Sequence, residues 1–204
     1  MMGWFASTRF LGTLTALVVF STQVQAAERS CKITPGESTF SVHTDTEGLL
    51  SMLAHKRVIQ ATQFSGQMVY AQDAMQNSRI ELLIETEGLV PMGEELSESD
   101  RETITANLRE TIGAGSYPTM HFGSQTVTPV DGGVRVSGTL RMKGVARKIA
   151  VDVKLEHSQD VLVMSGEFTV KQSDFQMKPY SALLGTLKVA DEIRFEFNAR
   201  CQLQ

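Results

Sequence analysis

Three polar residues near the first predicted turn could do chemistry together: His43, Asp45 and His55. An imidazole beside a carboxylate can hold a metal ion or act as a general base. No H-x-x-x-H pair on a helix and no cysteine ligand supports a metal site, so none is predicted. Ser51 and Ser181 lack the G-x-S-x-G setting of a serine nucleophile, and no glycine-rich phosphate loop is present. The chain is therefore not expected to be an enzyme or to require a cofactor, and a His/Asp-based enzyme is kept as a third alternative.

The two cysteines, Cys31 and Cys201, are the other reactive pair in the sequence. In an oxidising compartment an isolated pair usually forms a disulfide. Such a bridge needs the first and last segments to be neighbours, as they are when a sheet closes into a barrel. We therefore predict a Cys31–Cys201 disulfide, with two separate buried thiols as the alternative.

Residues 1–26 are typical of a secretory signal peptide. Arg9 is the only charge before Glu28, an apolar run follows over residues 10–20, and Val24 and Ala26 form a small-residue cleavage site. An uncleaved membrane anchor needs about 20 apolar residues, more than this run supplies. The sequence thus predicts an exported protein with a single domain over residues 27–204.

The charge of the chain argues against nucleic acid as a partner. Lys and Arg number 19 against 23 Asp and Glu, which gives a formal net charge of −4, and no basic block is present. Proteins that bind a phosphate backbone usually carry a basic surface.

Short runs that alternate apolar and polar residues predict strands through most of this domain. Asp131-Gly132-Gly133 and Lys143-Gly144 are hairpin signals between them. The eight predicted strands cover residues 40–42, 64–70, 80–84, 120–122, 134–142, 149–155, 162–170 and 193–201.

Two segments break the alternation. Over residues 99–112, a Ser99 to Glu102 capping box precedes Ile104, Leu108 and Ile112 at helical spacing, which predicts one amphipathic helix that ends at a glycine. Residues 174–187 form a long loop near the predicted barrel mouth, and loops of this length are usually functional or covering.

These elements predict an all-β fold, an eight-stranded antiparallel barrel, because closure removes the exposed sheet edges. The interior of such a barrel can be packed with side chains or can hold one small ligand. Large Phe and Met residues on the inward face alternate with Gly66, Gly138, Gly166 and Ala199, which could leave room in the lumen. Composition alone does not decide between an interior filled by side chains and a true cavity.

The order and spacing of six short motifs resemble the YceI-like family, the lipid- or polyisoprenoid-binding, lipocalin-like domains of secreted bacterial proteins. The resemblance runs from about residue 36 to residue 202. The motifs are Ser41-Val42-His43, Phe64-Ser65-Gly66, the segments 117–122 and 138–145, Ser173-Asp174-Phe175, and the segment 189–193.

This resemblance implies a periplasmic carrier or storage protein that holds an isoprenoid or quinone-type, ubiquinone-like lipid in an apolar lumen. The expected partner is a long-chain apolar lipid, and the protein would be a monomer or a homodimer. Carried over by position, the lumen residues are Phe40, Val42, Phe64, Met68, Leu82, Ile84, Phe122, Val136, Leu140, Val151, Val153, Phe168, Phe195 and Phe197.

Two further interpretations are left open. The chain could instead be a secreted stress-response or protein-interaction module without a bound lipid, which would use the 174–187 loop or the helix face. A set of basic residues in turns could gather at one barrel end and meet a polar lipid head or, transiently, a membrane surface, or could be ordinary solvated charges. These residues are Lys56, Arg57, Arg141, Lys143, Arg147 and Lys148.

Overall fold

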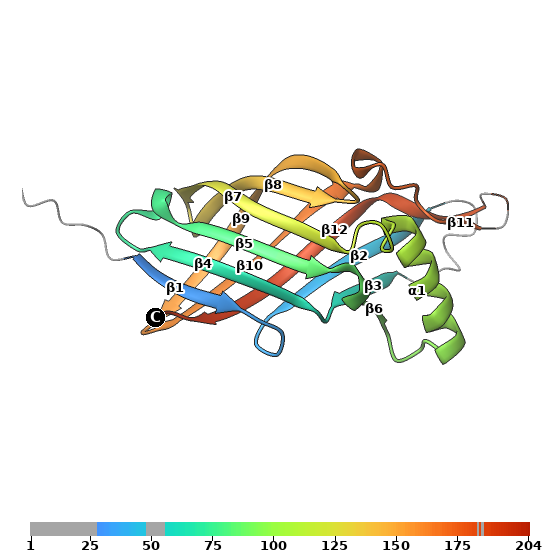
Figure 1. Cartoon of the computed structure of the whole chain (residues 1–204), viewed down its shortest axis with the longest axis horizontal. Coiled ribbons are helices and arrows are strands. Elements are labelled where there is room, and N and C mark those ends of the chain that lie inside the picture. Colours follow the sequence, from blue (N-terminus) through green and yellow to red (C-terminus); the bar gives the residue numbers. More distant parts are fainter. Residues whose placement is uncertain (1–27, 48–55, 183, 185) are drawn as a thin grey trace, which may run out of the picture.

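A computed structural model describes residues 28–47, 56–182, 184 and 186–204, and it shows strands with one α-helix (Figure 1). The predicted signal peptide over residues 1–26, Ser51 and His55 lie outside the described residues. The strands are β1 (Glu28–Ile33), β2 (Thr39–Glu47), β3 (Arg57–Ala61), β4 (Phe64–Ala71), β5 (Arg79–Glu85), β6 (Leu89–Met92), β7 (Thr119–Val130), β8 (Gly133–Met142), β9 (Val145–Ser158), β10 (Val161–Lys171), β11 (Ser181–Ala182) and β12 (Leu187–Gln202). The helix is α1 (Glu98–Ile112), and short 3-10 turns are η2 (Met75–Asn77), η3 (Thr86–Gly88) and η4 (Gln172–Phe175).

All these strands belong to one sheet with the order β1-β4-β5-β7-β8-β9-β10-β12-β2-β3-β6, and β11 pairs with β12. The prediction of an all-β antiparallel fold is confirmed, but the prediction of eight strands was wrong, because the described residues form a twelve-stranded sheet. Each predicted strand is present, as β2, β4, β5, β7, β8, β9, β10 and β12.

A bend in one long hairpin accounts for two of the additional strands. β3 pairs with β6 in the same way as β4 pairs with β5. Two backbone hydrogen bonds carry this pairing through the bend: Thr62 N–H donates to Gly88 O at 2.8 Å, and Glu85 N–H donates to Gln63 O at 3.0 Å. The bent hairpin therefore counts as four strands where the sequence pattern indicated two.

The sheet curls into a half-barrel rather than the closed barrel that the alternation predicted. β10 pairs with β9 only up to the Gly166–Val153 pair, and beyond it β10 continues along β12 to Lys171. The wall is consequently not hydrogen-bonded between the first half of β9 and the last residues of β10. The η4 turn contacts both strands there and buries Phe175 almost completely.

The disulfide between Cys31 and Cys201 joins β1 to β12, which confirms the predicted pairing. Next to it, Ser30 and Gln204 exchange two backbone hydrogen bonds, of 3.2 Å and 2.9 Å. The first and last described segments therefore lie side by side, at the end of the molecule that carries the C-terminus in Figure 1. We call this the disulfide end.

Helix α1 lies at the opposite end, together with β6 and β11, and we call this the α1 end (Figure 1). The helix cap differs from the prediction: Ser97, not Ser99, is the N-cap, and its Oγ accepts a hydrogen bond from Asp100 N–H at 3.1 Å. Ile104, Leu108 and Ile112 pack against the core as predicted, and Gly113 ends the helix in the left-handed region. In the described part of the chain, no helix is both long and apolar enough to cross a membrane.

The two predicted hairpin turns are confirmed. Only Asp131 and Gly132 separate β7 from β8, and Lys143 and Gly144 separate β8 from β9. Both residues of the second turn have positive φ, 48° and 75°, which is the geometry that matches the twist of a tight hairpin. These turns fix the register in which β7, β8 and β9 present their apolar faces.

Candidate functional site

An apolar cavity of about 110 Å³ lies on the inner face of the curled sheet. Its wall follows from strand alternation, because residues directly opposite on neighbouring antiparallel strands share a face. Val136 opposes Val151, and Leu82 opposes Phe122, and all four side chains line the cavity. The interior is thus hollow over part of its length.

All but two of the predicted lumen residues line this cavity. They are Phe40, Val42, Leu82, Ile84, Phe122, Val136, Leu140, Val151, Val153, Phe168, Phe195 and Phe197. The exceptions, Phe64 and Met68, are buried in the packed part of the core instead. The ring of Phe64 packs edge-on against Phe40 at a centroid distance of 4.9 Å, and Met68 opposes Cys31 in the β1–β4 register.

Further apolar side chains complete the wall, and the sequence reasoning did not assign them to the lumen. Most of them lie on predicted strands, on the same face as the predicted lumen residues, so the alternation of the sequence already indicated that they face inward. They are Ile80, Met120, Met142, Ile149, Met164 and Ala199. Ile33, Ala61 and Leu89 also line the cavity, but they come from β1, β3 and β6, which the sequence reasoning did not predict.

The disulfide end of the interior is filled. Leu162 and Cys201 are at most 1% exposed, and Val134 and Leu203 are also buried, while none of these residues lines the cavity. The cavity therefore has a floor near the disulfide and extends from there toward the α1 end.

Two glycines of the wall make room for aromatic rings. A Cβ at Gly138 would lie 2.7 Å from the Phe122 ring, and a Cβ at Gly166 would lie 2.9 Å from the Phe197 ring. Each ring thus occupies space that a side chain at the glycine would otherwise take. The hollow is bounded by rings: Phe168 stacks on Phe195 at 4.8 Å, and Phe197 stacks on Phe40 at 6.1 Å.

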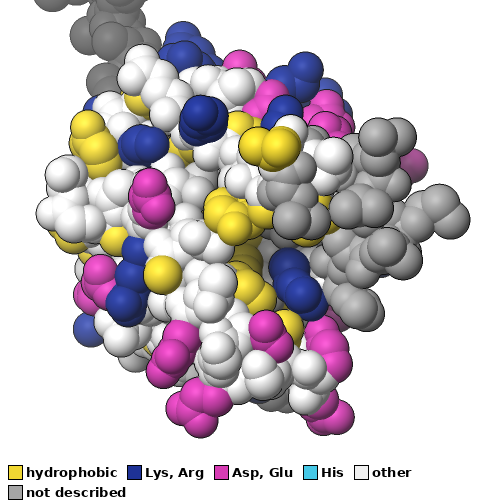
Figure 2. Space-filling model, turned by 90° about the vertical axis from the view of Figure 1, so that its right-hand side faces the viewer, with side chains coloured by type: hydrophobic (Ala, Val, Ile, Leu, Met, Phe, Trp, Pro, Cys, Tyr) yellow, Lys and Arg dark blue, Asp and Glu magenta, His cyan; other side chains and the backbone are white. Residues whose placement is uncertain are grey.

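The α1 end shows where this interior meets the surface. In Figure 2, hydrophobic side chains lie at the bottom of a hollow near the centre of this end, and charged side chains of both signs surround it. Phe168, Phe195 and Phe122 are only half-buried, as expected for wall residues beside an open space.

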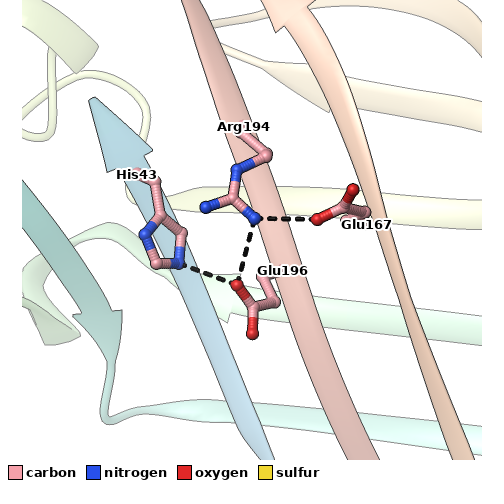
Figure 3. A network of polar contacts seen from close by, with 4 residues as sticks. All are labelled: His43, Glu167, Arg194 and Glu196. Carbon is pink, nitrogen blue, oxygen red and sulfur yellow. Dashed lines mark hydrogen bonds and ion pairs between the residues drawn. The ribbon is translucent and has the colours of Figure 1, made fainter. Parts of the chain in front are cut away.

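The predicted polar group of His43 and Asp45 is not assembled. His43 Nε2 lies 3.1 Å from Glu196, and Arg194 pairs with both Glu196 and Glu167, at 3.2 Å and 2.7 Å (Figure 3). These residues lie on the outer face of β2, β12 and β10. Asp45 pairs instead with Lys56 at 3.0 Å. Among the residues that the structure describes, no three His, Cys, Asp or Glu side chains form a group that could hold a metal ion.

Three of the six basic residues named from the sequence have partners beyond the adjacent residue, and the first of these pairs is the Lys56–Asp45 pair. Arg57 Nη1 lies 3.5 Å from Glu95, and Lys143 Nζ donates to Thr111 O at 2.9 Å. Arg141 and Lys148 are exposed on the outer face of the β8–β9 hairpin. Arg147 differs from the others, since it occupies an inner-face position.

Known structures with this arrangement were found by comparison of folds. BcnA from Burkholderia cenocepacia has a TM-score of 0.68 and 18% identity, over 82% of this chain and 98% of that chain. A YCEI protein from Campylobacter jejuni has a TM-score of 0.56 and 16% identity, over 70% of this chain and 82% of that chain. A polyisoprenoid-binding domain from Saccharophagus degradans, implicated in plant cell wall breakdown, has a TM-score of 0.58 and 12% identity, over 88% of this chain and 100% of that chain.

At these identities the likeness establishes a shared fold only. The comparison with curated proteins finds no match. The family model described as the YceI-like domain, however, matches residues 32–201, which is nearly the whole described sheet. The chain therefore belongs to the YceI-like family.

Proposed function

We propose that this protein is a periplasmic carrier or storage protein that holds a long-chain isoprenoid or quinone-type lipid in its apolar cavity. The observation that carries the proposal is a hollow walled by apolar side chains, packed at the disulfide end and opening toward the α1 end. The structural likeness to a polyisoprenoid-binding domain supports the same ligand class. No polar group in the wall is needed, because an apolar chain binds through burial.

Burial of the chain can supply the required affinity. At about 25 cal/mol per Å², the burial of about 400 Å² of prenyl chain gives roughly 10 kcal/mol of gross binding free energy. Association costs of about 4 kcal/mol or more must be subtracted from this value. At the lower end of that cost about 6 kcal/mol remains, which corresponds to a Kd of tens of micromolar.

The proposed location rests on residues 1–26 acting as a signal peptide and on the disulfide, which suits an oxidising compartment. A transient membrane contact at the α1 end would bring the hollow to a source of lipid. Met92 on β6, Tyr117 after α1 and Tyr180 next to β11 support it, since each large apolar side chain is exposed. Such residues suit the boundary between water and lipid.

Binding of farnesol, a C15 prenyl alcohol, tests the proposal. Ile149 is half-buried on the cavity wall, so Ile149→Trp should fill the hollow and reduce farnesol binding in a protein that still folds. Leu140→Arg and Phe122→Arg should abolish binding, because each places a charge in the apolar wall. Lys154→Ala, an exposed outer-face change on the same strand as Ile149, is the matched control and should bind as the parent does. Equal farnesol binding by the parent and by folded Ile149→Trp would contradict the proposal.

A further inference from the structure

A charged side chain, that of Arg147, belongs to the inner face of the wall, in line with residues that line the cavity. On β9, Ile149, Val151 and Val153 all line the cavity, and Arg147 is the next residue on the same face. The register between β8 and β9 is continuous and places Arg147 directly opposite Leu140, which also lines the cavity. Directly opposed residues share a face, so Arg147 belongs to the inner row of side chains.

Arg147 lies next to the cavity lining rather than in it, between Ile149 and the β8–β9 turn. Val145, two residues nearer the β8–β9 turn, packs against the core, and Lys143 in that turn reaches helix α1. Arg147 is exposed, and it lies at a level where β10 no longer pairs with β9. Its side chain is thus open to solvent beside the cavity-lining residues Leu140 and Ile149.

Arg147 has no acidic partner within the described residues. Its one hydrogen bond runs from Nη1 to the carbonyl oxygen of the preceding residue, Ala146, at 3.1 Å. Arg135, on the outer face of the same hairpin, forms two hydrogen bonds with Asp152, at 2.7 Å and 2.8 Å. The hairpin therefore pairs its outer arginine with a carboxylate and leaves most donors of the inner arginine free.

A second inner-face arginine lies on a strand distant from β9 in the sheet order. Arg57 on β3 shares its face with Ile59 and Ala61, and Ala61 lines the cavity. Its Nη1 atom is buried without a hydrogen bond, but Glu95 at 3.5 Å offsets its charge. Among the inner-face residues of the described strands, the positive charge without an acidic partner is therefore that of Arg147.

We propose that Arg147 binds the oxyanion head, a phosphate or a carboxylate, of a lipid whose apolar chain fills the cavity. This inference rests on the proposed function and adds the class of head group. A guanidinium offers two parallel N–H donors that match the two oxygens of a carboxylate or phosphate. The head would lie at the rim, where water can solvate it, and the chain would extend toward the floor near the disulfide.

Three probes with the same C15 chain test the head group: farnesyl phosphate, farnesoic acid and farnesol. Arg147→Gln should weaken binding of the two anions by about tenfold, the usual loss for a hydrogen bond to a charged group, and should leave farnesol binding unchanged. Lys148→Gln removes the same charge from the adjacent, outer-face position and should leave all three affinities unchanged. Comparison of the two anions shows whether phosphate or carboxylate is the preferred head.

The result that overturns the inference is an Arg147→Gln protein that binds the anions as tightly as the parent, or one that loses anions and farnesol equally. Equal losses in Lys148→Gln would also overturn it, since a general surface potential would then explain the effect. Failure of the proposed function looks different, because the parent would then bind none of the three probes.

Discussion

The wall position of Gly138 gives the sharpest prediction about how the cavity is kept open. A Cβ at this position would lie 2.4 Å from Gly123 O and 2.7 Å from the Phe122 ring. The carbonyl belongs to the neighbouring strand of the ladder, so it can move only if β7 moves. In Gly138→Ala, part of the strain should be relieved by rotation of the Phe122 ring into the cavity.

The expected cost follows from the overpacked contact. An extra methyl group in a well-packed site costs about 1–3 kcal/mol of unfolding free energy. For a chain of this size each kcal/mol lowers Tm by about 2–4 °C, so Gly138→Ala should lower Tm by roughly 2–12 °C. The displaced ring should also reduce the affinity for farnesol.

Differential scanning calorimetry and a farnesol titration measure both effects. Gly115→Ala is the matched control, because a Cβ there has no neighbour within 4 Å and the residue is not in the left-handed region. Adding Phe122→Leu to Gly138→Ala should recover only part of the loss, since the clash with Gly123 O persists. A Gly138→Ala protein with the Tm and farnesol affinity of Gly115→Ala would refute this reasoning.

Three other predictions concern stability. Cys31→Ala should lower the unfolding free energy by up to about 5 kcal/mol in the chain-entropy model, because the bridge spans 170 residues, and a reductant should then have no further effect in calorimetry. Hydrogen bonds from the Ser173 hydroxyl and backbone N–H lower the pKa of Asp191 in the folded protein. Their stabilising effect is therefore present above the pKa of an unfolded Asp, about 3.9, and is lost as the pH falls through the lower pKa of the folded state. In urea unfolding, the Asp191→Asn protein should therefore lose less unfolding free energy than the parent when the pH falls below about 4. An equal loss in both proteins would show that the ionised Asp191 is not the source of this stability. The Arg101 side chain donates to two carbonyl oxygens at the end of β6, so Arg101→Ala should speed hydrogen exchange in α1, whereas Glu98→Ala should not.

Alternation along the chain was sufficient to predict which residues face inward. In β8, every second residue from Val134 to Met142 is buried, and the hairpin signals at both of its ends set the register. The disulfide was also predictable, because two isolated cysteines near the chain ends had few other partners. What alternation cannot predict is where neighbouring strands stop pairing, since the break between β9 and β10 after Gly166 depends on contacts between distant segments.

The same limit explains the strands and wall residues that were not predicted. β6 has four residues and includes Pro91, so its apolar character did not indicate a strand. Arg147 looked like a turn charge because it follows Lys143-Gly144 closely, and only the register with Leu140 places it on the inner face. The rings that occupy the space at Gly138 and Gly166 are likewise a property of cross-strand packing.

Native mass spectrometry of the disulfide-bonded protein, purified without detergent and then incubated with farnesol, tests most directly whether the hollow holds an apolar chain. We expect one molecule of lipid per chain, either co-purified or taken up from the farnesol, and loss of that adduct in Ile149→Trp but not in Lys154→Ala. A folded protein that carries no lipid and takes up none would show that the cavity does not bind an apolar chain.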